Sequence, residues 1–197
     1  MQMDPAEVAK VVLQHKLVAF ALQEIPSKKF YCQLRDLLGS QYEGHFASFN
    51  SWDHFAFLWK PTRMTWRGDW HLSSVGKYCL FHLEDHEGWI WSPVIVHFQF
   101  KIKSSRKREL LAAALKDLLA GGNAVFILGD MNMPPSQYED HLTIGLKAVL
   151  SDLSLTTTCS SLDNFLLPHH WTAHYQVLNT FNLSDHFPVL ATICPAA

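Results

Sequence analysis

The sequence predicts a single α/β domain, and three observations support this. The 197 residues can bury a sizeable core but are few enough for one domain, so residues 1–197 are taken as one unit. A composition of 48% hydrophobic, 13% aromatic and 17% charged residues is typical of globular proteins and excludes a disordered chain. Aromatic and β-branched segments of strand length occur together with amphipathic segments of helical period, which favours the α/β class.

The first elements expected are a capped helix and a buried strand. Asp4 can cap a helix in which Pro5 takes the first position and Glu7 returns the capping interaction. The apolar stripe of this helix consists of Val8, Val11 and Val12. Residues 17–25, LVAFALQEI, form a nearly continuous apolar run, which predicts a buried strand that delivers Glu24 to its end.

A short helix and a series of strands are expected next. Residues 28–38, KKFYCQLRDLL, predict an amphipathic helix that ends at Gly39. The expected strands are HFASFN, HFAFLWK, YCLFHLE and WIWSPVIVHFQF, with turn signals at Pro61, Gly68, Gly76 and Gly88.

The second half of the chain continues with both kinds of element. Residues 106–122, RKRELLAAALKDLLAGG, predict a helix that ends at Gly121, because its leucines and alanines fall on one face. The strand NAVFIL follows it, and a further helix is expected around 136–150. The last strands are expected near SLDNFLL and FPVLATI.

Charge, targeting signals and cysteines exclude several classes of protein. A net charge of −2 gives no global attraction to nucleic acid or anionic membranes, so a polyanion would need a local basic patch. The N-terminus has no signal core, and no apolar run reaches the ~18 residues that span a bilayer, so we expect an intracellular protein, cytoplasmic or nuclear. No CxxC pair is present, so we expect reduced, partly buried thiols at Cys32, Cys79, Cys159 and Cys194.

Polar residues that suit phosphate chemistry are associated with the predicted strands. Most stand at strand ends and one lies within a strand: Glu24, Asp130, Asn132, Asp163, Asp185 with His186, and His97. Strand ends that converge on one rim gather catalytic groups in α/β folds. Carboxylates hold hard cations such as Mg²⁺, and imidazoles and carboxylates move protons. Each residue alone could serve a turn or the core, but their ordered co-occurrence favours one shared site.

The order of these motifs resembles that of the endonuclease/exonuclease/phosphatase (deoxyribonuclease-I-like) superfamily. The motifs are LQE, a strand that carries a His, GDMN, LDNFLL and SDHFPV, and together they span nearly the whole chain. The pairing of GD-x-N with a later SDH-x-PV is specific, whereas LQE alone is weak. The resemblance implies a four-layer α/β sandwich, with two mixed β-sheets packed face to face and helices outside.

The resemblance also implies a metal and a set of phosphate-binding groups. Glu24 and Asp185 would hold Mg²⁺, with Mn²⁺ as an alternative cation. Asp130 and Asn132 would position or activate the attacking water and bind phosphate.

The same resemblance implies roles for two histidines, one in proton transfer and one in phosphate binding. His186 would act as the general base or acid, and Asp163 would orient it and stabilise its charged form. His97 would donate a hydrogen bond to a phosphate oxygen.

The sequence departs from the family pattern in two places. Family members begin with a central strand that ends in an Asn beside the metal-binding Glu, and no Asn precedes Glu24 here. Because loss of a central strand exposes unpaired backbone groups, we expect this strand upstream, and we expect residues 1–197 alone to be nearly inactive until it is restored. Where family nucleases often carry an Arg, Lys77 and His82 are possible substitutes, although a solvated loop is expected for both.

The substrate class is expected to be nucleic acid. GDMNMPP and SSLDNF lack the Tyr-Arg and Cys-Asp-Arg signatures of inositol polyphosphate phosphatases, and GDMNMPPSQYEDHL is loosely similar to the pattern of deadenylases and general nucleases. A basic cluster could meet a phosphate backbone or simply be a solvated helix start: Lys101, Lys103, Arg106, Lys107 and Arg108. The seven tryptophans could stack on bases, but core packing is their commoner role.

A histidine-rich segment tempts a metal interpretation that we do not adopt. HHWTAH carries His169, His170 and His174, but no cysteine or carboxylate spacing completes a site, so we expect a loop near the last strands. Two hypotheses of function remain open: a magnesium-dependent phosphodiesterase that cleaves nucleic acid, and a degenerate module that binds without cleaving. A phosphatase or phosphodiesterase acting on a lipid or nucleotide is a further alternative.

Overall fold

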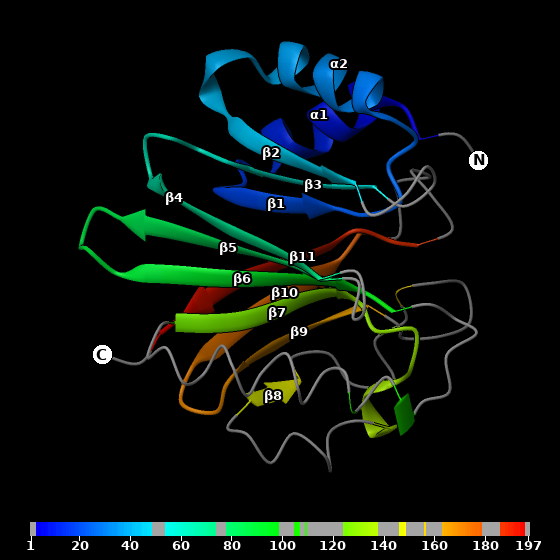
Figure 1. The fold of residues 1–197 in the computed structure, drawn as a ribbon, viewed down its shortest axis with the longest axis vertical. Coiled ribbons are helices and arrows are strands. Elements are labelled where there is room, and N and C mark those ends of the chain that lie inside the picture. The colour runs from blue at the N-terminus through cyan, green and yellow to red at the C-terminus, as the bar shows by residue number, and fades with distance from the viewer. Residues whose placement is uncertain are drawn as a thin grey trace.

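The computed structural model describes residues 3–48, 54–73, 78–98, 105–106, 109, 124–137, 146–148, 156, 163–178 and 186–195 (Figure 1). The helices are α1 (Pro5–Gln14) and α2 (Lys28–Leu38), with 3₁₀ turns at Gly39–Gln41 and Pro135–Gln137. The strands are β1 (Ala19–Leu22), β2 (Glu43–Ser48), β3 (His54–Trp59), β4 (Met64–Ser73), β5 (Tyr78–Asp85), β6 (Ile90–His97), β7 (Ala124–Asp130), β8 (Leu146–Ala148), β9 (Asp163–Pro168), β10 (Thr172–Val177) and β11 (Val189–Cys194). The α/β class predicted from the sequence is confirmed.

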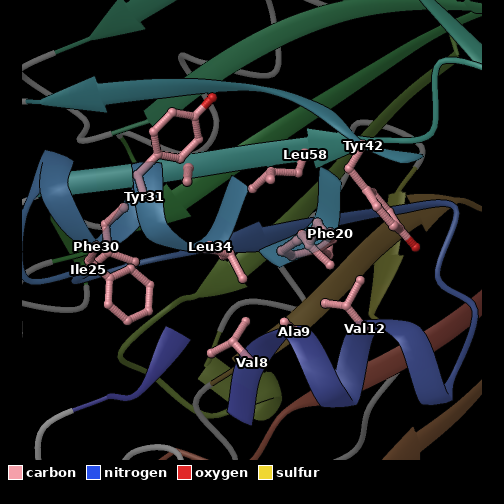
Figure 2. Close-up of a cluster of buried hydrophobic side chains, with 12 residues drawn as sticks. Val8, Ala9, Val12, Phe20, Ile25, Phe30, Tyr31, Leu34, Tyr42 and Leu58 are labelled. Atoms are coloured by element: carbon pink, nitrogen blue, oxygen red, sulfur yellow. The ribbon is translucent and has the colours of Figure 1, made fainter. Parts of the chain in front are cut away.

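The two N-terminal helices cover one face of a three-stranded antiparallel sheet of order β1-β3-β2 (Figure 1). Asp4 caps α1 as predicted, since its carboxylate accepts a hydrogen bond from the Ala6 N–H at 2.9 Å. Ser27 caps α2 in the same way through the Phe30 N–H, at 3.2 Å. The helices and the sheet share a buried core that includes Val8, Val12, Phe20, Leu34, Tyr42 and Leu58 (Figure 2). This packing fixes β1, and with it the segment that follows β1.

A six-stranded sheet of order β4-β5-β6-β7-β9-β8 packs against the other face of the three-stranded sheet. The apolar core between the two sheets combines Phe55, Phe57 and Trp59 of β3 with Cys79, Phe81, Leu83 and Ile95. Residues on the other face of the six-stranded sheet form a second core, which includes Val94 and Val96 of β6, Ile127 of β7 and Leu166 of β9. The helices, the three-stranded sheet and the six-stranded sheet are therefore layered, with one core between each pair of layers and a third on the far face of the six-stranded sheet.

Strand direction refines the expectation of two mixed sheets. In the six-stranded sheet β6 and β7 run parallel, and the neighbouring pairs run antiparallel, so this sheet is mixed. Among the described strands, those of the three-stranded sheet run antiparallel throughout, and β10 and β11 form a separate antiparallel pair. No helix within the described ranges has both the length and the apolar character that crossing a bilayer requires.

Three of the described strands were not predicted: β4, β10 and β8. β4 contains Gly68 with φ 85°, and the β4–β5 register shifts between Trp66 and Trp70, so an irregularity interrupts the apolar alternation that identifies a strand. β10 begins within the HHWTAH segment, for which a loop was expected. That expectation was wrong because β10 exposes Thr172, His174, Tyr175 and Gln176, and such a strand lacks an apolar period.

The helix expected around 136–150 was wrong over its last part. Leu146–Ala148 forms β8, which pairs antiparallel with β9, so tertiary pairing overrides local helical preference there. Residues 138–145 and 149–150 lie outside the described ranges, as does most of the predicted 106–122 helix, of which Arg106 and Glu109 are helical. The described cysteines are free thiols; Cys79 is buried whereas Cys32 and Cys194 are exposed, and Cys159 lies outside the described residues.

Candidate active site

Three of the residues singled out in the sequence lie side by side across neighbouring strands. His97, the last residue of β6, pairs with Asp130, the last residue of β7, in the parallel ladder. Asp130 in turn pairs with Asp163, the first residue of β9, in the antiparallel ladder. Directly paired residues project from the same face of a sheet. The register alone therefore brings an imidazole and two carboxylates into one row.

Glu24 reaches this row from the other sheet. It follows β1 and has a φ of 51°, a left-handed conformation that is uncommon for residues other than glycine. Its Oε1 lies 3.4 Å from His97 Nε2, and Asp130 Oδ2 lies 3.8 Å from the same nitrogen. The Glu24 side chain is 69% exposed, whereas those of His97 and Asp130 are 11% and 8% exposed. Glu24 thus places a carboxylate at the solvent side of a buried pair.

Asn132 is held against Asp130 by the turn that follows β7. Its backbone N–H donates to Asp130 Oδ1 at 2.6 Å, and its Nδ2 donates to Asp130 Oδ2 at 2.6 Å and to the Phe98 carbonyl at 2.6 Å. Asn132 itself has a φ of 47°, which Asn tolerates better than most residues. The motif GDMN therefore folds so that the amide and the carboxylate form one rigid unit.

His186 completes the row through Asp163. The Nδ1 of His186 lies 2.7 Å from Asp163 Oδ2, and both side chains are partly buried. The buried Thr156 braces this pair, since its hydroxyl accepts a hydrogen bond from the Asp163 N–H at 3.1 Å. The Thr156 carbonyl also accepts a hydrogen bond from the Phe187 N–H at 2.6 Å. Residues far apart in the sequence are thereby fixed at one end of the six-stranded sheet.

Asp130 is the electrostatic centre of the row. Burial of its carboxyl group, together with the neighbouring Asp163 carboxylate, raises the pKa of Asp130 to about 6. The hydrogen bond from Asn132 and the charges of His186 and His97 act to lower this pKa but do not outweigh the first two effects. Such a carboxyl group changes its charge close to neutral pH, which suits a group that handles protons.

The structure therefore brings together six of the residues selected from the sequence: Glu24, His97, Asp130, Asn132, Asp163 and His186. The seventh, Asp185, lies outside the described residues. Sequence reasoning missed Gln23, whose side chain hydrogen-bonds to both β6 and β7, and Thr156. The position of Gln23 beside Glu24 in LQE was the signal available for it, whereas nothing in the sequence distinguishes Thr156 from neighbouring threonines.

Other residues considered from the sequence lie away from the row. His82 is in β5, not in a loop, and its Nδ1 lies 2.8 Å from the hydroxyl of Ser92, near the start of β6 rather than at its His97 end. Lys77 lies outside the described residues. Arg106, the described member of the basic cluster, forms an ion pair with Glu109 at 2.7 Å.

The described tryptophans serve packing more than surface recognition. Trp59 and Trp171 are buried in the core, as the commoner role predicts. Trp66 and Trp89 are the exposed ones, at 37% and 50%. Both lie toward the β5–β6 turn, at the opposite end of the sheet from His97, so neither is placed to stack on a base held at the row.

The chemistry of the row suits a hard cation. Within the described ranges, no group of three or more His, Cys, Asp or Glu side chains is arranged to hold a metal ion. Mg²⁺ does not need such a cage, because it is commonly bound by one or two carboxylates together with waters and substrate phosphates. The exposed carboxylate of Glu24 and the crowded acidic pair of Asp130 and Asp163 offer oxygen donors and negative charge. These residues therefore fit a magnesium ion.

Comparison with known proteins gives a consistent result. The family model described as the endonuclease/exonuclease/phosphatase family matches residues 1–186. An endonuclease/exonuclease/phosphatase family protein from Bacteroides thetaiotaomicron has 16% identity and a TM-score of 0.79, over 98% of this chain and 89% of that chain. Danio rerio TDP2, in a structure complexed with a single strand DNA product, has 14% identity and a TM-score of 0.75, over 96% of this chain and 90% of that chain.

A third solved structure extends the likeness to a mobile-element protein. The endonuclease domain of TRAS1, a telomere-specific non-LTR retrotransposon, has 11% identity and a TM-score of 0.72, over 99% of this chain and 93% of that chain. No curated protein matches the sequence significantly. At these identities the solved structures establish the fold, which is that of deoxyribonuclease I-like proteins. The match of the family model over nearly the whole length shows that this chain belongs to the endonuclease/exonuclease/phosphatase family.

Proposed function

We propose that this protein is a magnesium-dependent phosphodiesterase that hydrolyses phosphodiester bonds of nucleic acid. The observation that carries the proposal is the continuous row from Glu24 through His97 and Asp130 to the Asp163–His186 pair. Hydrolysis of a phosphodiester needs a proton acceptor or donor, groups that orient water and phosphate, and positive charge to offset the phosphoryl oxygens. The row has residues suited to the first two needs, and its carboxylates suit a cation that would supply the third.

His186 acts as the general base or acid in this proposal. A carboxylate can only accept hydrogen bonds, so the His186 Nδ1–H donates to Asp163 Oδ2 across the 2.7 Å contact. That bond fixes the tautomer in which Nε2 carries the lone pair, so Nε2 takes or returns the proton. The Asp163 carboxylate also stabilises the imidazolium that forms after proton transfer. A positioned acid or base of this kind contributes ~10²–10⁴-fold to the rate.

Asp130 and Asn132 position the attacking water. The two hydrogen bonds that Asn132 Nδ2 donates, to Asp130 Oδ2 and to the Phe98 carbonyl, fix the plane of its amide. Its Oδ1 then accepts a hydrogen bond from the water, and the Asp130 carboxylate accepts a second one. His97, whose Nε2 lies 3.4 Å from Glu24 Oε1 and 3.8 Å from Asp130 Oδ2, would donate its Nε2–H to a phosphate oxygen. Fixed groups of this kind avoid reorganisation during the reaction.

The metal belongs at the exposed side of the row. Glu24 and Asp185 would hold Mg²⁺ there, with Mn²⁺ as a substitute, and Asp185 directly precedes His186 in the sequence. When bound, the cation neutralises charge on the phosphoryl group. The left-handed backbone of Glu24 turns the carboxylate toward His97, which keeps it close to the groups that act on the phosphate.

Nucleic acid is the favoured substrate because of the solved structures that share this fold. One of them holds a single strand DNA product, and another is a retrotransposon endonuclease domain. The missing phosphoinositide signatures in GDMNMPP and SSLDNF point the same way.

The proposal is tested by a cleavage assay with and without Mg²⁺, using single-stranded DNA, duplex DNA, RNA and a small chromogenic phosphodiester and phosphomonoester. Both residues 1–197 and the chain extended upstream are assayed, so that the expectation of a preceding strand is tested together with the activity. Magnesium-dependent cleavage of a nucleic acid supports the proposal. Cleavage of the monoester alone, or saturable binding of DNA or RNA without cleavage by either form, would contradict it and favour a phosphatase or a binding module respectively.

A further inference from the structure

The side chain of Gln23 inserts between the two sheets at the candidate active site. Gln23 follows β1 of the three-stranded sheet, yet its amide meets two strands of the six-stranded sheet. Its Nε2 donates to the Val96 carbonyl on β6, and its Oε1 accepts from the Asp130 N–H on β7 at 3.1 Å. Val96 pairs with Gly129 in the β6–β7 ladder, and the next pair is His97 with Asp130. One primary amide therefore joins three strands beside the row of site residues.

The backbone at Gly129 is shaped around this side chain. Gly129 has a φ of 131°, and a Cβ added there would overlap both the Gln23 amide and the Val96 carbonyl. The space that a side chain of residue 129 would fill is thus occupied by a side chain from a segment more than a hundred positions earlier. The glycine in GDMN and the glutamine in LQE are complementary parts of one junction.

The junction of Gln23 with Gly129, Val96 and Asp130 sets the positions of the neighbouring site residues. Glu24 is the next residue after Gln23, with its backbone in the left-handed region, and its Oε1 lies 3.4 Å from His97 Nε2. Asp130 holds Gln23 through its own backbone N–H and holds Asn132 through its carboxylate. A shift of the Gln23 amide therefore moves Glu24 relative to both His97 and Asp130.

We propose that Gln23 is a positioning residue that fixes Glu24 against His97 and Asp130 by hydrogen bonds to β6 and β7. Its amide is engaged by the backbone of β6 and β7, so it acts through the positions of Glu24, His97 and Asp130. The inference rests on the proposed phosphodiesterase function for its kinetic consequence but not for its structural one. A displacement of ~1 Å at a catalytic group costs ~10²-fold in rate, so loss of these hydrogen bonds should lower kcat by roughly 10–10²-fold.

The decisive variant is Gln23→Met, which keeps the length of the side chain but can neither donate to Val96 nor accept from Asp130 as an amide does. Gln23→Glu is its companion, because it keeps the acceptor for the Asp130 N–H and places a second acceptor against the Val96 carbonyl. Gln33→Met is the matched control, since Gln33 is exposed on α2. We expect Gln23→Met and Gln23→Glu to lower kcat, with KM within about twofold because substrate groups are untouched, and Gln33→Met to match the wild type.

Two readouts separate this inference from the proposed function. If the wild type cleaves and folded Gln23→Met retains its kcat, the side chain only fills space and the inference is overturned while the function stands. If the wild type does not cleave, the junction is judged by NMR. The inference is supported if the Gln23 side-chain amide protons exchange slowly and show NOEs to the Asp130 N–H. It is also supported if the chemical shifts of His97 and Asp130 change in Gln23→Met but not in Gln33→Met. Rapid exchange of the Gln23 amide protons, together with unchanged His97 and Asp130 chemical shifts in Gln23→Met, would overturn the inference.

Discussion

Asp130 lies directly opposite Asp163 in the β7–β9 ladder. Like charges at directly paired positions of a sheet oppose each other, and here one of the two is also buried. The unfavourable charge is seen at Asp130, because burial and the Asp163 carboxylate raise its pKa to about 6. The charge on Asp130 therefore lowers the stability of the folded protein, and in the proposed function the same charge attracts the cation and holds the water.

The first prediction follows from the sign of this pKa shift. Between the ordinary pKa of 3.8 and about 6, the folded protein keeps a proton on Asp130 that the unfolded chain releases. The contribution of Asp130 to stability is therefore present below pH 3.8 and lost as the pH rises through about 6. In buffer free of divalent cations, the Tm of Asp130→Asn minus that of the wild type should increase between pH 4.5 and pH 7.5. A change on the order of 1 kcal/mol corresponds to ~2–4 °C for a chain of this size.

Asp36→Asn is the control for this measurement, because Asp36 is exposed on α2. Its difference in Tm from the wild type should stay constant over the same pH range. A difference for Asp130→Asn that is flat, or that falls as the pH rises, would show that Asp130 does not carry an unfavourable charge in the folded protein. Addition of Mg²⁺ at pH 7.5 should raise the Tm of the wild type more than that of Asp130→Asn.

A second prediction compares two of the four described glycines that have a positive φ, Gly129 and Gly39. Gly129→Ala should destabilise the protein by more than ~1–2 kcal/mol and abolish cleavage, because the new Cβ overlaps the Gln23 amide and the Val96 carbonyl. Gly39→Ala, at a φ of 59° and a ψ of −151°, meets open space and should cost only the backbone strain of ~1–3 kcal/mol, less than Gly129→Ala, which adds the overlap. Chemical denaturation of both variants measures the difference. Equal losses of stability would mean that residue 129 has room for a side chain and that the junction is loose.

A third prediction separates stability from activity at the far end of the sheet. Asp85 closes the β5–β6 turn, where its carboxylate accepts hydrogen bonds from the Trp91 indole at 2.7 Å and from the Glu87 and Trp89 N–H groups. Although burial acts to raise the pKa of Asp85, these hydrogen bonds outweigh it and the pKa is lowered. Asp85→Ala should therefore lower the Tm, by an amount equivalent to ~1 kcal/mol for each lost bond of this type at most. Its kcat should match that of the wild type, and a large loss of kcat would show that the turn communicates with the row.

The sequence was sufficient for the parts of the fold that repeat a simple pattern. β3, β6 and β7 are continuous apolar runs, and the capped α1 carries Asp4, Pro5 and a valine stripe, so their types follow from local chemistry. β4 and β10 escaped because a register shift in one and exposure in the other remove the apolar alternation. β8 escaped because its pairing with β9 is a tertiary effect that no local window contains.

The site was predictable as a set of residues but not as an arrangement. Strand ends and motif order selected His97, Asp130 and Asp163, whereas the register that pairs them directly is set by long-range packing. Gln23 was overlooked because its only signal in the sequence is its place beside Glu24 in LQE. Its importance depends on the φ of Gly129, a property of the folded chain.

The central claim is tested most directly by the rate of magnesium-dependent cleavage under single-turnover conditions, comparing the wild type with His186→Ala and with His174→Ala. His174 is exposed on β10, so its variant controls for loss of a surface imidazole. The measurement is made on whichever form cleaves, residues 1–197 or the chain extended upstream. We predict a loss of ~10²–10⁴-fold for folded His186→Ala and no change for His174→Ala. Equal cleavage by all three proteins, or none by either wild-type form, would contradict the role of the Asp163–His186 pair and with it the proposed chemistry.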